Sequence, residues 1–195
     1  MARALRHTPD RLLHAGRRRE LQARLHARGV PRSILFICFG NICRSPYAAL
    51  RMAQALPEEL RNAIEISSAG FIGAGRPSPK EAVEVAAALG TDMAAHRSTP
   101  ITPDAVKAAD LVVVMDTVQY GWICQGFGRD PGAVMMLGDL DPERIDTRTV
   151  HDPVEQPAEV FREVYARIDR CVEALAVLIA DSAREKGSTA PSCVE

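Results

Sequence analysis

The 195-residue chain lacks any apolar run long enough to cross a membrane. Its longest runs, such as 111–115, fall far short of the roughly 20 residues that a spanning helix needs, and no apolar segment of the secretory type follows the basic N-terminus. Cysteine is sparse: there are 5, an odd number without framework spacing, which predicts reduced thiols in a cytoplasm. None of the 5 histidines pairs with cysteines at zinc-finger spacing, so we expect no metal site and no cofactor.

Acidic residues are nearly absent from the first 32 positions. This segment holds nine arginines against Asp10 and Glu20, a net charge of +7, and since the whole chain carries −1, residues 33–195 carry −8. Between 10 and 27 a thin apolar stripe predicts a basic helix, and it consists of Leu13, Arg17, Leu21 and Leu25. Such a helix could stay solvated, contact an acidic partner or a membrane surface, pack back onto the acidic remainder, or belong to a transit peptide. We expect no nucleic-acid partner.

The remainder of the chain alternates between two kinds of segment. Short β-rich or apolar runs bounded by turn signals predict four strands, at 33–39, 64–68, 111–115 and 133–137. Helices are expected at 46–55, 79–89, 103–109, 117–126 and 157–183. This alternation predicts an α/β domain over 33–183, a four-stranded parallel sheet with helices on both faces. Residues 1–32 are then a basic N-terminal extension, and 184–195 a flexible tail.

Residues 33–46 read S-I-L-F-I-C-F-G-N-I-C-R-S-P, an apolar run that ends on a cysteine and continues into a short polar loop. The run is typical of a strand buried in a parallel sheet, and Pro46 suits the first turn of a helix, so the loop lies between strand and helix. At such a junction, backbone N–H groups and the helix dipole favour a bound anion, and Gly40 lets the backbone approach it closely. A thiol placed there is expected to ionise readily.

This placement predicts phosphoryl transfer. The thiolate of Cys38 attacks phosphorus, while the planar guanidinium of Arg44 binds two phosphoryl oxygens bidentately. The expected intermediate is a phosphocysteine. Ser45 is short enough to donate a hydrogen bond to the sulfur when water later displaces it.

The stretch C-F-G-N-I-C-R-S-P resembles the active-site loop of the low-molecular-weight protein tyrosine phosphatases. The resemblance covers about 33–180 and includes I-S-S-A-G at 66–70, D-M-A-A-H-R at 92–97 and H-D-P-V at 151–154. It implies hydrolysis of phosphotyrosine, with Asp152 as general acid and then general base. It also implies a hydrogen-bond network that fixes the loop, formed by Asn41, Ser45, Ser68 and His96. The loop residues expected to bind the substrate are Phe39, Gly40, Asn41, Ile42 and Cys43.

Val154 departs from the family pattern, which commonly has an aromatic residue after Asp-Pro. In the relatives such aromatics form the wall of the slot that holds the substrate ring, and here Phe71 or Trp122 could replace the missing aromatic residue. Because Val154 does not supply that wall, a protein arginine phosphatase is an alternative. The related arginine phosphatases typically carry threonine where this chain has Ile42, whose branched apolar side chain favours an aryl substrate.

The alternative from another functional class is a phosphate-binding module with little turnover, recruited by its basic N-terminal extension. Thioredoxin-coupled arsenate reductases resemble the same loop, but they need two further neighbouring cysteines, and Cys124, Cys171 and Cys193 lie far apart in sequence. Cys43 could form a reversible disulfide with Cys38 under peroxide, or simply pack within the loop. The resemblance implies a phosphotyrosine protein as the substrate, such as a bacterial tyrosine kinase.

Overall fold

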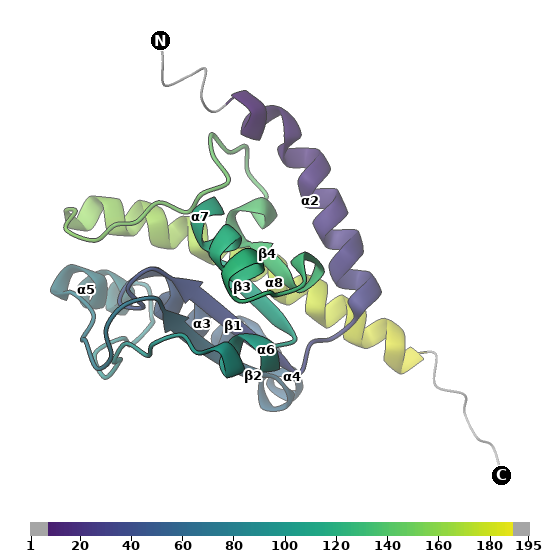
Figure 1. Cartoon of the computed structure of the whole chain (residues 1–195), viewed down its shortest axis with the longest axis horizontal. Coiled ribbons are helices and arrows are strands. Elements are labelled where there is room, and N and C mark those ends of the chain that lie inside the picture. Colours follow the sequence, from purple (N-terminus) through teal and green to yellow (C-terminus); the bar gives the residue numbers. More distant parts are fainter. Residues whose placement is uncertain (1–7, 189–195) are drawn as a thin grey trace.

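The structure is a computed structural model that describes residues 8–188. Its centre is a sheet of four parallel strands in the order β2-β1-β3-β4 (Figure 1). The strands are β1 (Ser33–Cys38), β2 (Glu65–Gly70), β3 (Leu111–Val114) and β4 (Val134–Met136). All four expected strands are present. β1 and β3 are buried almost throughout, because their apolar runs suit strands covered on both faces.

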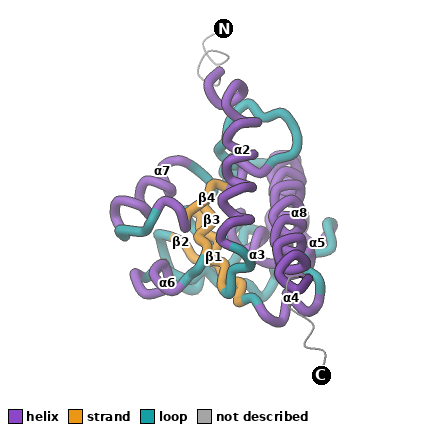
Figure 2. Tube along the Cα trace, turned by 90° about the vertical axis from the view of Figure 1, so that its right-hand side faces the viewer, coloured by secondary structure: helices purple, strands orange, loops and turns teal. Residues whose placement is uncertain are grey.

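Helices cover both faces of the sheet (Figure 2). One face packs against α3 (Arg44–Ala55), α5 (Lys80–Ala88) and α8 (Ala158–Ser188). The other packs against α6 (Pro103–Ala108), α7 (Thr117–Gly121) and the π-helical turn η1 (Trp122–Gly126). Two 3-10 turns, η2 (Pro131–Ala133) and η3 (Leu137–Leu140), flank β4. The α/β fold predicted from the sequence is therefore confirmed.

Two segments differ from the sequence-based expectations. Helix α4 (Glu58–Ala63) was not predicted, and since none of its residues is buried, no apolar stripe marks it in the sequence. The tail expected from residue 184 is wrong for its first five positions, because α8 continues to Ser188. This last part contains good helix formers and lies beside the N-terminal helix, where His26 Nε2 and Glu185 Oε2 are 3.2 Å apart. Residues 189–195 and 1–7 lie outside the described part of the chain.

The basic extension forms a helix, α2 (Thr8–Arg28), that lies against α8 and η3 (Figures 1 and 2). Its buried residues are His14 and Leu21, with Leu25 partly buried, whereas Leu13 is 51% exposed. The expected apolar stripe is thus wrong at its first position. His14 and Leu21 are two helical turns apart and lie on the same, covered face of α2, so Leu13 faces solvent. The basic helix packs back onto the domain, which was one of the alternatives left open.

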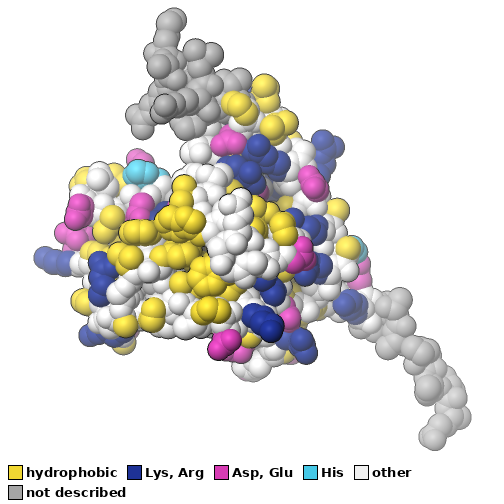
Figure 3. All heavy atoms as spheres, viewed as in Figure 1, with side chains coloured by type: hydrophobic (Ala, Val, Ile, Leu, Met, Phe, Trp, Pro, Cys, Tyr) yellow, Lys and Arg dark blue, Asp and Glu magenta, His cyan; other side chains and the backbone are white. Residues whose placement is uncertain are grey.

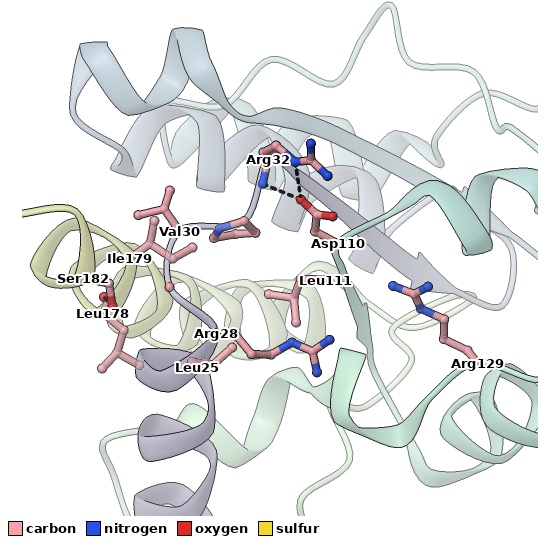
Figure 4. A pocket seen from close by; sticks show the side chains of 12 residues that line it. Leu25, Arg28, Val30, Arg32, Asp110, Leu111, Arg129, Leu178, Ile179 and Ser182 are labelled. Atoms are coloured by element: carbon pink, nitrogen blue, oxygen red, sulfur yellow. Dashed lines mark hydrogen bonds and ion pairs between the residues drawn. The ribbon is translucent and has the colours of Figure 1, made fainter. Parts of the chain in front are cut away.

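A short joint connects α2 to β1. Gly29, with a φ of 75°, ends the helix, and the backbone N–H and Nε of Arg32 donate to Asp110 Oδ2 at 2.8 and 3.3 Å. Beside this joint lies a cavity of about 360 Å³ with apolar walls from α2 and α8 (Figure 4). Arg32 and Asp110 stand just before β1 and β3, so the cavity lies at the amino ends of the strands. No helix within 8–188 is long and apolar enough to span a bilayer.

Candidate active site

The phosphate loop predicted from the sequence, residues 38–44, lies at the carboxyl end of β1. Cys38 is the last residue of that strand and is 2% exposed, and α3 begins at Arg44. Ligands of open parallel sheets bind at the carboxyl ends of the strands. The loop therefore presents the thiol of Cys38 and a helix N-terminus at the same point, as the sequence predicted. Helix α3 starts two residues before the expected Pro46.

The sulfur of Cys38 receives two hydrogen bonds. Ser45 Oγ lies 3.0 Å from Cys38 Sγ, and the backbone N–H of Asn41 donates to the same sulfur at 3.2 Å. Both donors are buried. The Cys38 sulfur is therefore an acceptor of two hydrogen bonds at the N-terminus of α3.

Asn41 is the centre of the network that fixes the loop. Its backbone is in the left-handed region, with a φ of 50°, and its side chain is fully buried. Nδ2 donates to Ser45 Oγ at 2.8 Å and to Ser68 Oγ at 2.9 Å, and Oδ1 accepts from the N–H of Thr99 at 2.8 Å. His96 Nε2 lies 2.7 Å from the backbone oxygen of Asn41. The structure thus brings together all four residues that the resemblance assigned to this network.

Arg44 is buried beneath the loop, with 3% of its side chain exposed. Nη1 donates to the backbone oxygen of Val150 at 3.1 Å, and Nη2 forms a short ion pair with Asp152 Oδ2. A second carboxylate, Asp116 Oδ2, lies 3.8 Å from Nη1. Arg44 Nε is buried and has no hydrogen-bond partner among the described residues. One N–H of the guanidinium is therefore available to an incoming oxyanion.

Arg44 and Asp152 line a cavity of about 270 Å³. Its apolar walls come from Phe39 and Trp122, which are 43% and 42% exposed, and from Val118. The ring centroids of Phe39 and Trp122 are 6.2 Å apart. Apolar side chains gather over α7 on this face of the molecule (Figure 3). The cavity therefore combines charged groups with an aromatic wall.

Ile42 and Cys43, predicted to bind the substrate, have buried side chains within the hydrophobic core. Any contact they make with a ligand must come from their backbone N–H groups. Burial, together with the charges of Cys38 and Asp152, raises the pKa of the Cys43 thiol far above its ordinary value. Cys43 is therefore a protonated neighbour of Cys38.

Several residues of the cavity were not predicted as site residues from the sequence: Asp116, Val118, Gln119, Trp122 and Thr149. Asp116 carried a usable signal, because it is an acidic residue just after the carboxyl end of β3. It also caps α7, since Asp116 Oδ1 accepts from the N–H of Gln119 at 2.8 Å. Trp122 was considered a possible replacement for the aromatic residue missing from the wall of the substrate slot. Its position in η1 could not be derived from the local sequence pattern.

Comparison with known proteins identifies the same family as the resemblance found in the sequence. The family model described as low molecular weight phosphotyrosine protein phosphatase matches residues 33–186. The "Probable low molecular weight protein-tyrosine-phosphatase EpsP" of Ralstonia solanacearum is 38% identical over 145 residues, which cover 73% of this chain and 92% of EpsP. The enzyme Ptp of Acinetobacter johnsonii, also named a low molecular weight protein-tyrosine-phosphatase, is 31% identical over 142 residues, 72% of this chain and 93% of Ptp.

Two solved structures illustrate the range of similar folds. The tyrosine phosphatase Wzb from Escherichia coli K30, in complex with sulphate, superposes with a TM-score of 0.67 at 27% identity, covering 76% of this chain and 98% of Wzb. The YwlE arginine phosphatase from Geobacillus stearothermophilus superposes with a TM-score of 0.68 at 27% identity, covering 83% and 99%. The chain belongs to the low molecular weight protein-tyrosine-phosphatase family.

Proposed function

We propose that this chain is a cysteine-dependent protein tyrosine phosphatase that works through a phosphocysteine intermediate. The observation that carries the proposal is the arrangement of Cys38, Arg44 and Asp152. The sulfur receives two buried hydrogen bonds, and the guanidinium meets the carboxylate in a cavity with an aromatic wall. These are the parts that transfer of a phosphoryl group to sulfur requires: a stabilised nucleophile, an anion-binding fork and a proton donor.

In the first step, the Cys38 thiolate attacks phosphorus, an S–P bond forms and the P–O bond to tyrosine breaks. Protonated Asp152 donates its proton to the leaving oxygen. The loop N–H groups and Arg44 hold the phosphoryl oxygens, and the unpartnered Nε of Arg44 supports this role. Substrate binding exchanges the ion pair between Arg44 and Asp152 for a contact between Arg44 and the phosphoryl group.

In the second step, water attacks the phosphocysteine, the S–P bond breaks and inorganic phosphate leaves. Asp152, now ionised, takes a proton from the attacking water. The sulfur departs as a thiolate, which Ser45 Oγ, 3.0 Å away, stabilises by donating a hydrogen bond. Asn41 orients Ser45 through the 2.8 Å hydrogen bond from Nδ2 to Oγ.

The cavity walls favour an aryl substrate. Phe39 and Trp122 offer ring surfaces on which a phosphotyrosine side chain can pack. Similarity of fold does not separate the two substrate classes, since Wzb and the arginine phosphatase YwlE superpose with TM-scores of 0.67 and 0.68. Comparing turnover of phosphotyrosine and phosphoarginine peptides tests this choice.

We further infer a phosphotyrosine protein as the substrate, such as a bacterial tyrosine kinase, because bacterial relatives are named tyrosine phosphatases. A cytoplasmic location fits a mechanism that needs a reduced Cys38, which is a free thiol here.

Arginine side chains line α2 (Figure 3), and Leu12 on that helix is 76% exposed. A contact of this helix with an acidic partner or a membrane surface stays a prediction. Vesicle co-sedimentation tests the membrane contact.

Hydrolysis of p-nitrophenyl phosphate tests the mechanism. Cys38→Ser is expected to abolish turnover, and Asp152→Ala to lower kcat/KM by about 10²-fold or more, the usual contribution of a general acid. Cys124→Ser, which alters a half-buried thiol outside the loop, is the matched control and should retain activity. Undiminished hydrolysis by Cys38→Ser would overturn the mechanism. Negligible turnover by the native chain, with tight binding of phosphate, would instead favour the binding-module alternative.

A further inference from the structure

Helix α2 contacts the loop that carries Asp152. We call residues 141–157, between η3 and α8, the acid loop. Asp10 Oδ2 accepts a hydrogen bond from the backbone N–H of Arg148 at 3.1 Å, and His14 Nε2 lies 2.9 Å from the backbone oxygen of Asp141. Figures 1 and 2 show this loop beside the N-terminal half of α2. The basic extension is thus bonded to the backbone of the segment that leads to Asp152.

The His14 contact is buried, and the Asp10 contact is partly buried. His14 is 8% exposed, and 22% of the Asp10 side chain is exposed. Burial opposes ionisation of Asp10, but the hydrogen bonds from Arg17 and from the backbone of Arg148 outweigh it and lower the pKa of this carboxyl group. A third contact, from Arg11 to Asp146, joins side chains that are 53% and 70% exposed, so it contributes little.

Other elements hold the acid loop from the opposite side. Arg167 on α8 donates to the backbone oxygens of Thr147 and Thr149 at 2.7 and 2.8 Å. Arg44 donates to the backbone oxygen of Val150 at 3.1 Å, two residues before Asp152. The segment 147–150 therefore lies between α8 and Arg44 on one side and α2 on the other. Arg148 Nε also donates to Asp139 Oδ1 in η3 at 3.0 Å, and the N–H of Val150 donates to the backbone oxygen of Met115 at 2.8 Å, so α2 supplies one of several anchors of this segment.

The family match begins at residue 33, so α2 is an addition to the family domain. We propose that α2 is a positioning element for the general acid, in which Asp10 and His14 hold the acid loop where Asp152 meets the leaving oxygen. This inference rests on the proposed function, because it assigns the proton donor to Asp152. Asp10 and His14 are positioning residues and not catalytic ones, since they act through the loop backbone.

A misplaced proton donor has a characteristic kinetic effect. Proton transfer matters most when the leaving group is a strong base, because a weak base departs readily without a proton. Phenyl phosphate therefore depends on Asp152 more than p-nitrophenyl phosphate does. Since kcat/KM reports steps up to formation of the phosphocysteine, comparison of this parameter for the two substrates isolates the position of the acid.

The test uses the full chain with Asp10→Ala and with His14→Ala, each checked for folding by thermal unfolding. For either variant, kcat/KM for phenyl phosphate is expected to fall about tenfold, part of the 10²–10⁴-fold that a general acid supplies, and kcat/KM for p-nitrophenyl phosphate about twofold. Asp10→Asn keeps an acceptor for the Arg148 N–H and should recover most of the loss. The matched control is Glu20→Ala, which removes the same charge from an exposed position of α2 that makes no hydrogen bond or ion pair with the acid loop, and it should behave as the native chain.

The Asp152→Ala background separates positioning from a general effect on the fold. If Asp10 and His14 act through Asp152, adding either substitution to Asp152→Ala should cause no further loss for either substrate. Equal losses of kcat/KM for both substrates, or additive losses of kcat/KM in the Asp152→Ala background, would overturn the inference. If Asp152→Ala itself lowered kcat/KM equally for both substrates, the proposed role of Asp152 would fail. Native behaviour of Asp10→Ala and His14→Ala beside an impaired Asp152→Ala would remove only the role of α2.

Discussion

The ring of Phe71 packs edge-on against Trp122, with centroids 4.8 Å apart and an interplanar angle of 71°. Phe71 follows β2, whereas Trp122 begins η1 after β3. Phe71 in turn packs against Phe127, with centroids 6.5 Å apart. The contact fixes Trp122 at the rim of the active-site cavity, where it forms a wall with Phe39. Val154 is 37% exposed and does not line that cavity.

Trp122→Ala is therefore expected to lower kcat/KM for aryl phosphates about 3- to 10-fold, since stacking contributes about 0.5–1.5 kcal/mol beyond buried area. Val154→Tyr, which restores the residue type common in the family, should change kcat/KM by less than about twofold because the wall is already present. Steady-state kinetics with phosphotyrosine peptides measures both. A large gain in Val154→Tyr with no loss in Trp122→Ala would place the ring of the substrate elsewhere.

Gly70 packs tightly against the phosphate loop. A Cβ added at this position would lie 2.7 Å from the backbone nitrogen of Asn41 and 2.9 Å from the backbone oxygen of Phe39. Because both are backbone atoms, they cannot rotate away as a side chain can, and the loop must shift. Gly70→Ala is expected to cost about 1–3 kcal/mol of unfolding free energy and to lower activity by displacing the donors to Cys38.

Thermal unfolding and kcat/KM for p-nitrophenyl phosphate check this prediction together. The control is Gly16→Ala on α2, where an added Cβ would meet no atom within 4 Å apart from the neighbouring backbone of its own helix. Because glycine is unfavourable inside a helix, that variant should gain about 0.5–1 kcal/mol. Full activity in Gly70→Ala would mean that the loop tolerates the shift.

The phosphate loop was predictable because its chemistry is local in sequence. One short stretch supplies the buried strand, Cys38, the glycine, Arg44 and the helix start, and the structure keeps them adjacent. Asp152 lies 108 positions from Arg44, so its place came from resemblance and not from a pattern. The aromatic wall and the contacts of α2 depend on how distant elements pack. Leu13 illustrates the limit: a helical stripe predicts an apolar face but not which residues the domain will cover.

Cys43 is expected to protect the nucleophile under peroxide. The Cys38 thiolate attacks peroxide, an S–O bond forms and hydroxide leaves, and the resulting sulfenic acid reacts with Cys43 to form a disulfide and water. The raised pKa of Cys43 keeps it a thiol, so Cys38 is the sulfur that oxidises first. Native activity lost to peroxide should return with dithiothreitol. Cys43→Ala should lose activity irreversibly, and equal recovery of both would mean that Cys43 only packs within the loop.

Tyr47 and Tyr165 stack in the core with ring centroids 3.8 Å apart. Burial and the neighbouring carboxylate of Asp169, to which Tyr47 Oη donates at 3.0 Å, raise the pKa of Tyr47 far above its ordinary value. Burial also raises the pKa of Tyr165. In the unfolded chain both phenols titrate at about pH 10, so above that pH the folded protein keeps protons that the unfolded chain releases.

The contribution of these phenols to stability is therefore complete below about pH 10 and declines as the pH rises from there toward the folded pKa values. Unfolding free energy measured in urea between pH 8 and pH 11 should fall at the alkaline end. Tyr47→Phe loses the hydrogen bond to Asp169, at a cost of about 1 kcal/mol near neutral pH, but it removes one titrating group and so should flatten the decline. An unchanged slope in this variant would assign the alkaline loss to other groups.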